Sequence, residues 1–237
     1  MKSIDILGYL LLGCTIAVVL NMYNFRQFME LTCKQSNIDG KKYCVRKDNS
    51  VQESVDMLAT VTVKCKKLVA HLKQKYKTED SRVNLLVKNF RADKVYEILP
   101  SSNFTAYSEN KGEKLAFCLN TTKSGEEPID ENTLTFVALH ELSHIATKSI
   151  GHTEEFWNNF KFLLHEAEAI GIYKVVDYKK TPQNYCGTEI KSNPYFREKI
   201  SLVTSTFLFI ELSKHIAVSE CISVAHSGIS VKNVSQM

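Results

Sequence analysis

One pentapeptide, H-E-L-S-H at residues 140–144, limits what this chain can fold into more than any other feature. It lies within an apolar stretch, 131–150, that is typical of a buried helix. Residues four apart lie on the same helix face, so His140 and His144 can bind one metal ion together. Glu141 would lie beside that ion, where a carboxylate can take a proton from metal-bound water. Two histidines satisfied by ordinary hydrogen bonds are the alternative, but H-E-x-x-H is rare by chance in a chain with seven histidines. The pattern therefore predicts part of a zinc site.

A catalytic zinc site also needs a third protein ligand and an open position for water. His152 is the best candidate, because Gly151 is well placed to end the helix and Thr153 to cap a new one. His152 would then lie at the reversal between two helices and fold back to the metal. Three residues further along the second helix stay open as alternatives for the third ligand: His165, Glu166 and Glu168.

The other elements predict an α+β fold class. A long helix should begin at Ser50 and run to about residue 77, with apolar residues on one face and lysines on the other. A short helix should follow over residues 81–90. Residues 104–119 have apolar residues on both sides of a polar turn, and Gly112 occupies the position that tolerates positive φ. This segment therefore predicts a β-hairpin.

The N-terminal segment, residues 6–23, contains no charged residue. As a helix it would rise about 27 Å, close to the thickness of a bilayer's hydrocarbon core. We therefore predict a single-pass transmembrane helix rather than a cleaved signal peptide, which would be shorter and end in small residues. The basic residues on the two flanks nearly balance, so the side of the membrane is not indicated. The predicted organisation is a membrane anchor over 1–24, an irregular stalk over 25–49, a small zincin-like domain over 50–197 and a C-terminal tail of unknown role over 198–237.

Composition excludes some classes of protein. With 44% apolar and 24% charged residues, the chain can bury a core and is not a disordered or fibrous protein. A net charge of +4 is too small to predict a nucleic-acid partner. The seven cysteines are widely spaced and form no C-x-x-C pair, so we expect scattered reduced thiols. One or two disulfides, for example between Cys33 and Cys44, are the alternative.

The metal-site segment resembles a known family. H-E-L-S-H followed by G-H-T-E-E-F-W at 151–157 resembles the WLM and SprT-like zinc metallopeptidases. More closely, residues 105–194 resemble an uncharacterised, membrane-anchored WLM-like group of large DNA viruses and some eukaryotes. The stretches that carry this match are AYSENKGEKLAFCL, TLTFVALHELSHIATKSIGHTEEFW and YKVVDYKKTPQNYCG.

The resemblance implies a zincin-like fold with His140, His144 and His152 as zinc ligands and Glu141 as general base. It also implies that an extended peptide binds by strand addition along an edge strand, which we place in the hairpin at 104–119. We therefore expect a membrane-anchored zinc metallopeptidase that hydrolyses protein or peptide substrates through a metal-activated water. The alternative is a non-catalytic, membrane-tethered binding or virion protein that retains a zincin fold.

Overall fold

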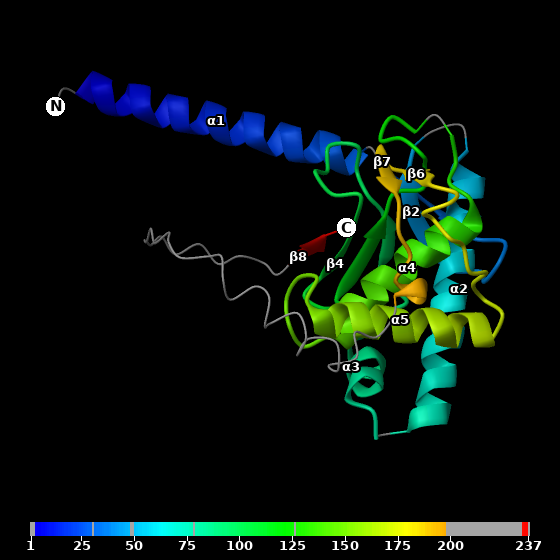
Figure 1. The fold of residues 1–237 in the computed structure, drawn as a ribbon. Helices are drawn as coiled ribbons and strands as arrows, with labels where there is room; N and C mark the ends of the chain where they lie inside the picture. The colour runs from blue at the N-terminus through cyan, green and yellow to red at the C-terminus, as the bar shows by residue number, and fades with distance from the viewer. Residues whose placement is uncertain are drawn as a thin grey trace, which may run out of the picture.

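The structure, a computed structural model, describes residues 3–29, 31–47, 50–77, 79–125, 127–197 and 234–236. Helix α4 (Glu131–Ala146) lies between a small sheet and the other helices of the domain (Figure 1). The helices that pack against α4 are α2 (Val51–Tyr76), α3 (Ser81–Asn89) and α5 (Glu154–Ala169). The α+β fold class and the predicted positions of these helices are confirmed.

Helix α4 is enclosed on all sides. Every residue from Thr133 to Ala146 is buried, as the largely apolar composition of the segment requires. The helix begins after Asp130, whose carboxylate accepts a hydrogen bond from the backbone N–H of Thr133 at 2.9 Å. This cap satisfies one of the N–H groups that a helix start leaves without a partner. The element that carries the H-E-x-x-H pattern is therefore held rigidly in the core.

The main sheet has the strand order β3-β5-β4-β8. Its strands are β3 (Val95–Glu97), β4 (Ala106–Glu109), β5 (Lys114–Phe117) and β8 (Val234–Gln236). β3 runs parallel to β5, whereas β4 is antiparallel to both β5 and β8. β4 and β5 are the two arms of the predicted hairpin, which is confirmed. Most of the predicted tail, residues 198–233, lies outside the described residues.

The turn between β4 and β5 depends on glycine. Asn110, Lys111 and Gly112 all have positive φ, and Gly112 reaches 109°. A Cβ atom at Gly112 would lie 2.8 Å from the carbonyl oxygen of Asn89 and 2.9 Å from Cδ1 of Ile145. Any side chain there would clash, so this turn packs directly against the last residues of α4.

The first helix, α1 (Ser3–Met29), extends away from the domain (Figure 1). Large apolar side chains along it, such as Leu11 and Val19, are exposed. The apolar run is interrupted by Gly8, Gly13, Thr15 and Asn21. Within the described parts of the chain, no helix is sufficiently long and apolar to span a membrane. The prediction of a transmembrane helix over residues 6–23 is therefore not supported.

A hairpin occupies most of the segment that we predicted to be an irregular stalk. Its strands are β1 (Leu31–Gln35) and β2 (Lys42–Arg46), and both pack against α2. Tyr43 and Val45 contribute to the core. The backbone N–H of Arg46 donates to Glu97 at 2.7 Å, and the guanidinium donates to the carbonyl oxygen of Ile98 at 2.8 Å. Residues 31–46 therefore pack as part of the domain, because β2 supplies apolar side chains that α2 covers.

Two disulfides are present, one within the β1–β2 hairpin and one between segments far apart in the sequence. Cys33 and Cys44 join β1 to β2, and Cys118, just after β5, joins Cys186 in the turn between β6 and β7. β6 (Gln183–Tyr185) and β7 (Thr188–Ile190) pair antiparallel with each other. The expectation of reduced thiols is wrong for these four cysteines, and the alternative pair of Cys33 with Cys44 is confirmed. Cys14 and Cys65 are free, and Cys221 lies outside the described residues.

The two disulfides should differ in their effect on stability. Their sequence separations are 68 residues for Cys118–Cys186 and 11 residues for Cys33–Cys44. From loop-closure entropy, we expect replacement of both cysteines by serine to cost about 4 kcal/mol for the first pair and about 3 kcal/mol for the second. Urea unfolding of the two double variants, each compared with the unmodified chain, measures this order. A larger loss for the Cys33–Cys44 pair would contradict it.

Candidate metal centre

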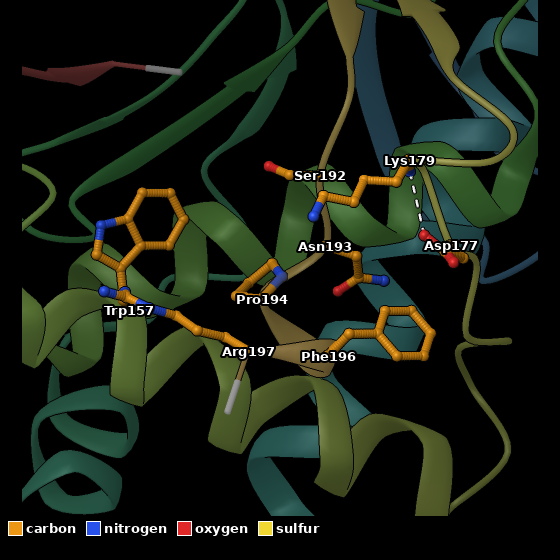
Figure 2. Close-up of a pocket in the computed structure, with 8 residues that line it drawn as sticks. All are labelled: Trp157, Asp177, Lys179, Ser192, Asn193, Pro194, Phe196 and Arg197. Atoms are coloured by element: carbon orange, nitrogen blue, oxygen red, sulfur yellow. Dashed lines mark hydrogen bonds between the residues drawn. The ribbon is translucent and has the colours of Figure 1, made fainter. Parts of the chain in front are cut away.

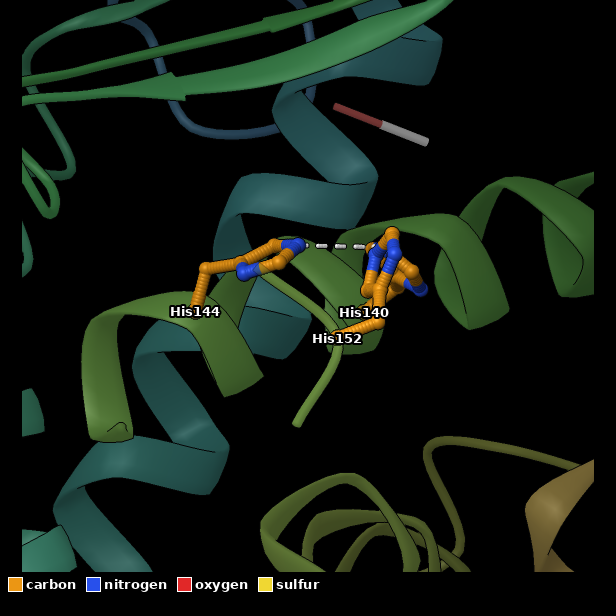
Figure 3. A group of neighbouring side chains, drawn as sticks. All are labelled: His140, His144 and His152. Carbon is orange, nitrogen blue, oxygen red and sulfur yellow. Dashed lines mark hydrogen bonds between the residues drawn. The ribbon is translucent and has the colours of Figure 1, made fainter. Parts of the chain in front are cut away.

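Three histidines converge on one point. His140 and His144 project from α4, and His152 reaches the same point from the loop before α5 (Figure 3). The Nε2 atom of His140 lies 3.2 Å from Nε2 of His144 and 3.0 Å from Nε2 of His152. Nitrogens that share one tetrahedral zinc ion at 2.0–2.1 Å are roughly 3.3 Å apart. Two of the three pairs therefore have about the spacing expected of ligands on one ion, and the three ligand atoms all lie within 4.8 Å of one another.

The loop between α4 and α5 is fixed by contacts at both ends. Gly151 has a φ of 80°, which lets the chain reverse, and the side chain of Thr153 caps α5 by accepting from Phe156 N–H. The ammonium of Lys111 donates to the carbonyl oxygens of Thr147 at 2.5 Å and Ser149 at 2.6 Å. These contacts satisfy carbonyl groups beyond the end of α4 and hold the loop that carries the third histidine.

Aromatic rings fill the space around the histidines. Phe156 stacks on His144 with 4.3 Å between ring centroids, and Phe160 meets the edge of His140 at 5.2 Å. Burial lowers the pKa of His144 to about 3 and also lowers the pKa of His152. Both imidazoles are therefore neutral near pH 7, which is the form that binds metal.

The carboxyl group of Glu141 forms no hydrogen bond with the described residues. Its side chain is completely buried, and neither carboxylate oxygen has a hydrogen-bond partner. Burial raises the pKa of this carboxyl group well above its ordinary value. A buried carboxylate without a partner is costly unless a ligand completes its environment. Three imidazoles, with a carboxyl group at the residue after the first of them, are the donor set of a catalytic zinc site, so the residues present fit zinc.

The alternative third ligands are engaged elsewhere. The carboxylate of Glu166 accepts hydrogen bonds from Lys75 at 2.8 Å and Tyr76 at 2.7 Å, and it lies 3.0 Å from Nε2 of His71. Glu168 accepts from Tyr195, and the ring of His165 packs on the same tyrosine. Glu166 thus ties α5 to α2, and only His152 reaches the centre.

The Glu166 cluster should matter for stability rather than for metal binding. Burial raises the pKa of Glu166, but the hydrogen bonds from Lys75, Tyr76 and His71 outweigh this and hold the pKa below 4.5. The stabilisation that the ionised Glu166 gives the folded state is therefore fully present above pH 4.5, and it is lost as the pH falls through the lowered pKa. We expect Glu166→Gln to cost roughly 1–2 kcal/mol at neutral pH and to flatten the loss of stability in acid. Thermal unfolding across this pH range measures it, with the exposed Glu79→Gln as control. An equal effect of both variants would contradict the assignment.

Tyr185 is a packed residue. It is fully buried, and its hydroxyl donates to the carbonyl oxygen of Thr105 and accepts from Cys118 N–H, both at 3.1 Å. Both bonds hold β6 against the end of β5. The hydroxyl is occupied by the backbone, as expected for a structural role.

A pocket that sequence reasoning missed lies next to the histidines. It has a volume of about 400 Å³, and Trp157 from α5 and Phe196 from the short 3-10 helix η1 (Pro194–Phe196) supply its aromatic walls (Figure 2). Its lining also contains Lys179, Asp177 and Arg197, and the last of these pairs with Glu154 at 2.9 Å. Trp157 also packs against His152, with 5.5 Å between ring centroids. The only signal in the sequence was the single tryptophan, five residues after His152.

Comparison with known proteins identifies the relatives of this chain. The model of the WLM domain matches residues 70–214. Uncharacterized protein R325 of Acanthamoeba polyphaga mimivirus is 30% identical over 167 residues, which cover 68% of this chain and 83% of that protein. Uncharacterized protein 136R of Invertebrate iridescent virus 6 is 37% identical over 82 residues, covering 34% of this chain and 44% of that protein. Wss1 from Saccharomyces cerevisiae, a solved structure, matches with a TM-score of 0.33 and 15% identity over 52% of this chain and 77% of that chain.

Proposed function

The chain belongs to the WLM domain family of metalloproteases, and from this premise we propose that it is a zinc-dependent peptidase that hydrolyses peptide bonds in protein substrates. The observation that carries the proposal is the convergence of three histidines, together with the buried carboxyl group of Glu141, the residue after His140, which has no hydrogen-bond partner. A site that only stabilised the fold would have no need of that carboxylate. The non-catalytic alternative, a binding protein with a zincin fold, leaves Glu141 without a purpose.

His140, His144 and His152 would hold the ion, and Glu141 would handle the proton. Zinc supplies a Lewis acid that polarises a carbonyl group and favours deprotonation of water. The carboxylate of Glu141 would take the proton from the attacking water and deliver it to the nitrogen of the leaving amine. Phe156 and Phe160 keep the imidazoles in place and exclude bulk water from the far side of the rings.

The substrate would bind as an extended chain. β4 is the arm of the hairpin on the side of the sheet away from β3, and its outer backbone groups can pair with one further strand, as they do with β8 in this structure. Pairing of this kind recognises the peptide backbone, so sequence preference would come from pockets near the histidines. The pocket beside Trp157 is the one we assign to a substrate side chain, and its walls of Trp157 and Phe196 favour a side chain with apolar surface.

The proposal is tested by metal removal and return. An unfolded protein substrate and a mixture of random peptides should be cleaved by the zinc-loaded chain. Cleavage should stop with a chelator such as 1,10-phenanthroline and resume when zinc is added in excess. Absence of cleavage by a folded, zinc-loaded chain, tested also after deletion of residues 234–237, would favour the binding protein instead.

A further inference from the structure

The outer edge of β4 is already paired in this structure. β8 lies antiparallel to β4, with Tyr107 opposite Gln236, Ser108 opposite Ser235 and Glu109 opposite Val234 (Figure 1). β8 comes from the far end of the chain, more than a hundred residues after β4. It completes the sheet order β3-β5-β4-β8 as the last strand. The edge that an incoming peptide would use is therefore occupied by the protein's own segment.

This edge runs beside the metal centre. β4 packs against α4, the helix that carries His140 and His144. The turn after β4 reaches the end of that helix, where Gly112 packs on Ile145 and Lys111 holds the loop before His152. A strand added to β4 would thus lie along the same side of the domain as the histidines.

A strand edge can pair with only one further strand at a time, because each backbone N–H and C=O group of the edge is used once. We propose that β8 is an intramolecular competitor of the substrate, which docks on β4 in place of a substrate peptide and holds the enzyme in a closed state. This inference rests on the proposed function, since it assigns a regulation to the same site.

The competition should be reversible. β8 pairs through only three residues, Val234–Gln236, and so short a pairing contributes little binding free energy by itself. Its advantage is that it belongs to the same chain, which gives it a high effective concentration at β4. Substrate must then displace β8. The apparent affinity for substrate is therefore the intrinsic affinity multiplied by the fraction of molecules in which β8 has left β4.

The direct test removes the competitor. Deletion of residues 234–237 should lower KM for a peptide substrate by about tenfold and leave kcat within about twofold, as expected for relief of competition. Deletion of Met237 alone keeps β8 and is the matched control, with no expected change. An unchanged KM after the longer deletion would overturn the proposal.

A binding measurement works without turnover. A fluorescent peptide with the sequence of residues 231–237, VKNVSQM, should bind the deletion variant, as seen by fluorescence anisotropy, and bind the full chain at least several-fold more weakly. The same residues in reversed order are the control peptide. Equal binding of the forward peptide to both chains, or no binding to either, would contradict the assignment of β8. If the peptide binds only the deletion variant but neither chain cleaves any substrate, the docking stands and the proposed peptidase function fails.

A covalent lock gives an independent check. Glu109 and Val234 lie opposite each other in the β4–β8 register, within the range of Cα separations that a disulfide can bridge. The variant Glu109→Cys/Val234→Cys, once oxidised, should neither bind the labelled peptide nor cleave substrate. The single variant Val234→Cys should behave like the unmodified chain under the same conditions. Full peptide binding by the oxidised double variant, with the bond verified by mass spectrometry, would overturn the proposal.

Discussion

Replacement of Glu141 by glutamine should lower kcat for peptide hydrolysis by about 10²–10⁴-fold, the range expected for loss of a general acid-base group. Glutamine has nearly the same shape but cannot accept a proton from the attacking water. Because Glu141 points to no protein partner, the substitution breaks no hydrogen bond within the described residues. We therefore expect the variant to fold normally and to bind zinc with the stoichiometry of the unmodified chain.

The control for this prediction lies on the same helix. Glu131 stands in the first turn of α4 and pairs with Lys64 at 2.6 Å, far from the histidines along the helix. Glu131→Gln should retain kcat within about threefold, since an exposed ion pair contributes little. Steady-state kinetics with one peptide substrate compares the three proteins. Hydrolysis by Glu141→Gln at the rate of the unmodified chain would rule out the general-base role.

Replacement of His140 by alanine should abolish both zinc binding and hydrolysis. His140 lies between the other two ligands, since its Nε2 atom is the one close to both His144 and His152. Two remaining imidazoles leave the ion with too few protein ligands, and a loss of activity of at least about 10³-fold follows from loss of the metal. Metal analysis after gel filtration, together with the peptide assay, measures both losses.

His165→Ala is the matched control for His140→Ala. His165 lies on α5 and packs against Tyr195 with 4.1 Å between ring centroids, away from the centre. Its replacement should leave zinc content and kcat unchanged. Zinc retained at full stoichiometry by His140→Ala, or lost equally from both variants, would show that the histidines of α4 and the following loop are not the ligands.

Local signals predicted most of the candidate metal centre. His140, Glu141 and His144 are separated by less than two helical turns, so their relative positions follow from helix geometry alone. His152 could be predicted because Gly151 and Thr153 determine where one helix ends and the next begins. The choice between His152 and Glu166 needed the tertiary structure, in which Lys75 and Tyr76 of α2 bind Glu166.

Contacts between distant segments could not be predicted from the sequence. Cys118 and Cys186 are 68 residues apart, and no local pattern indicates which cysteines pair. The hairpin of β1 and β2 was missed because its polar strands gain stability only by packing on α2, where Tyr43 and Val45 are buried. The pairing of β8 with β4 depends on backbone groups, which leave no signature in side-chain composition.

The apolar N-terminal segment shows a different limit. Its composition led to the prediction of a transmembrane helix, and the structure does place residues 3–29 in one helix. Length and apolar character indicate that a segment can form a helix, but they do not show that the helix crosses a membrane. The apolar side chains along α1, such as Leu11 and Val19, are exposed in this structure.

The measurement that tests the central claim most directly is zinc analysis combined with X-ray absorption at the zinc edge, on the full chain as purified and after zinc loading. The account predicts one zinc per chain, with three imidazole nitrogens and one oxygen at about 2.0 Å. Folded protein that takes up no zinc, or a zinc ion surrounded by sulfur or carboxylate ligands, would contradict the three-histidine centre and with it the proposed peptidase function.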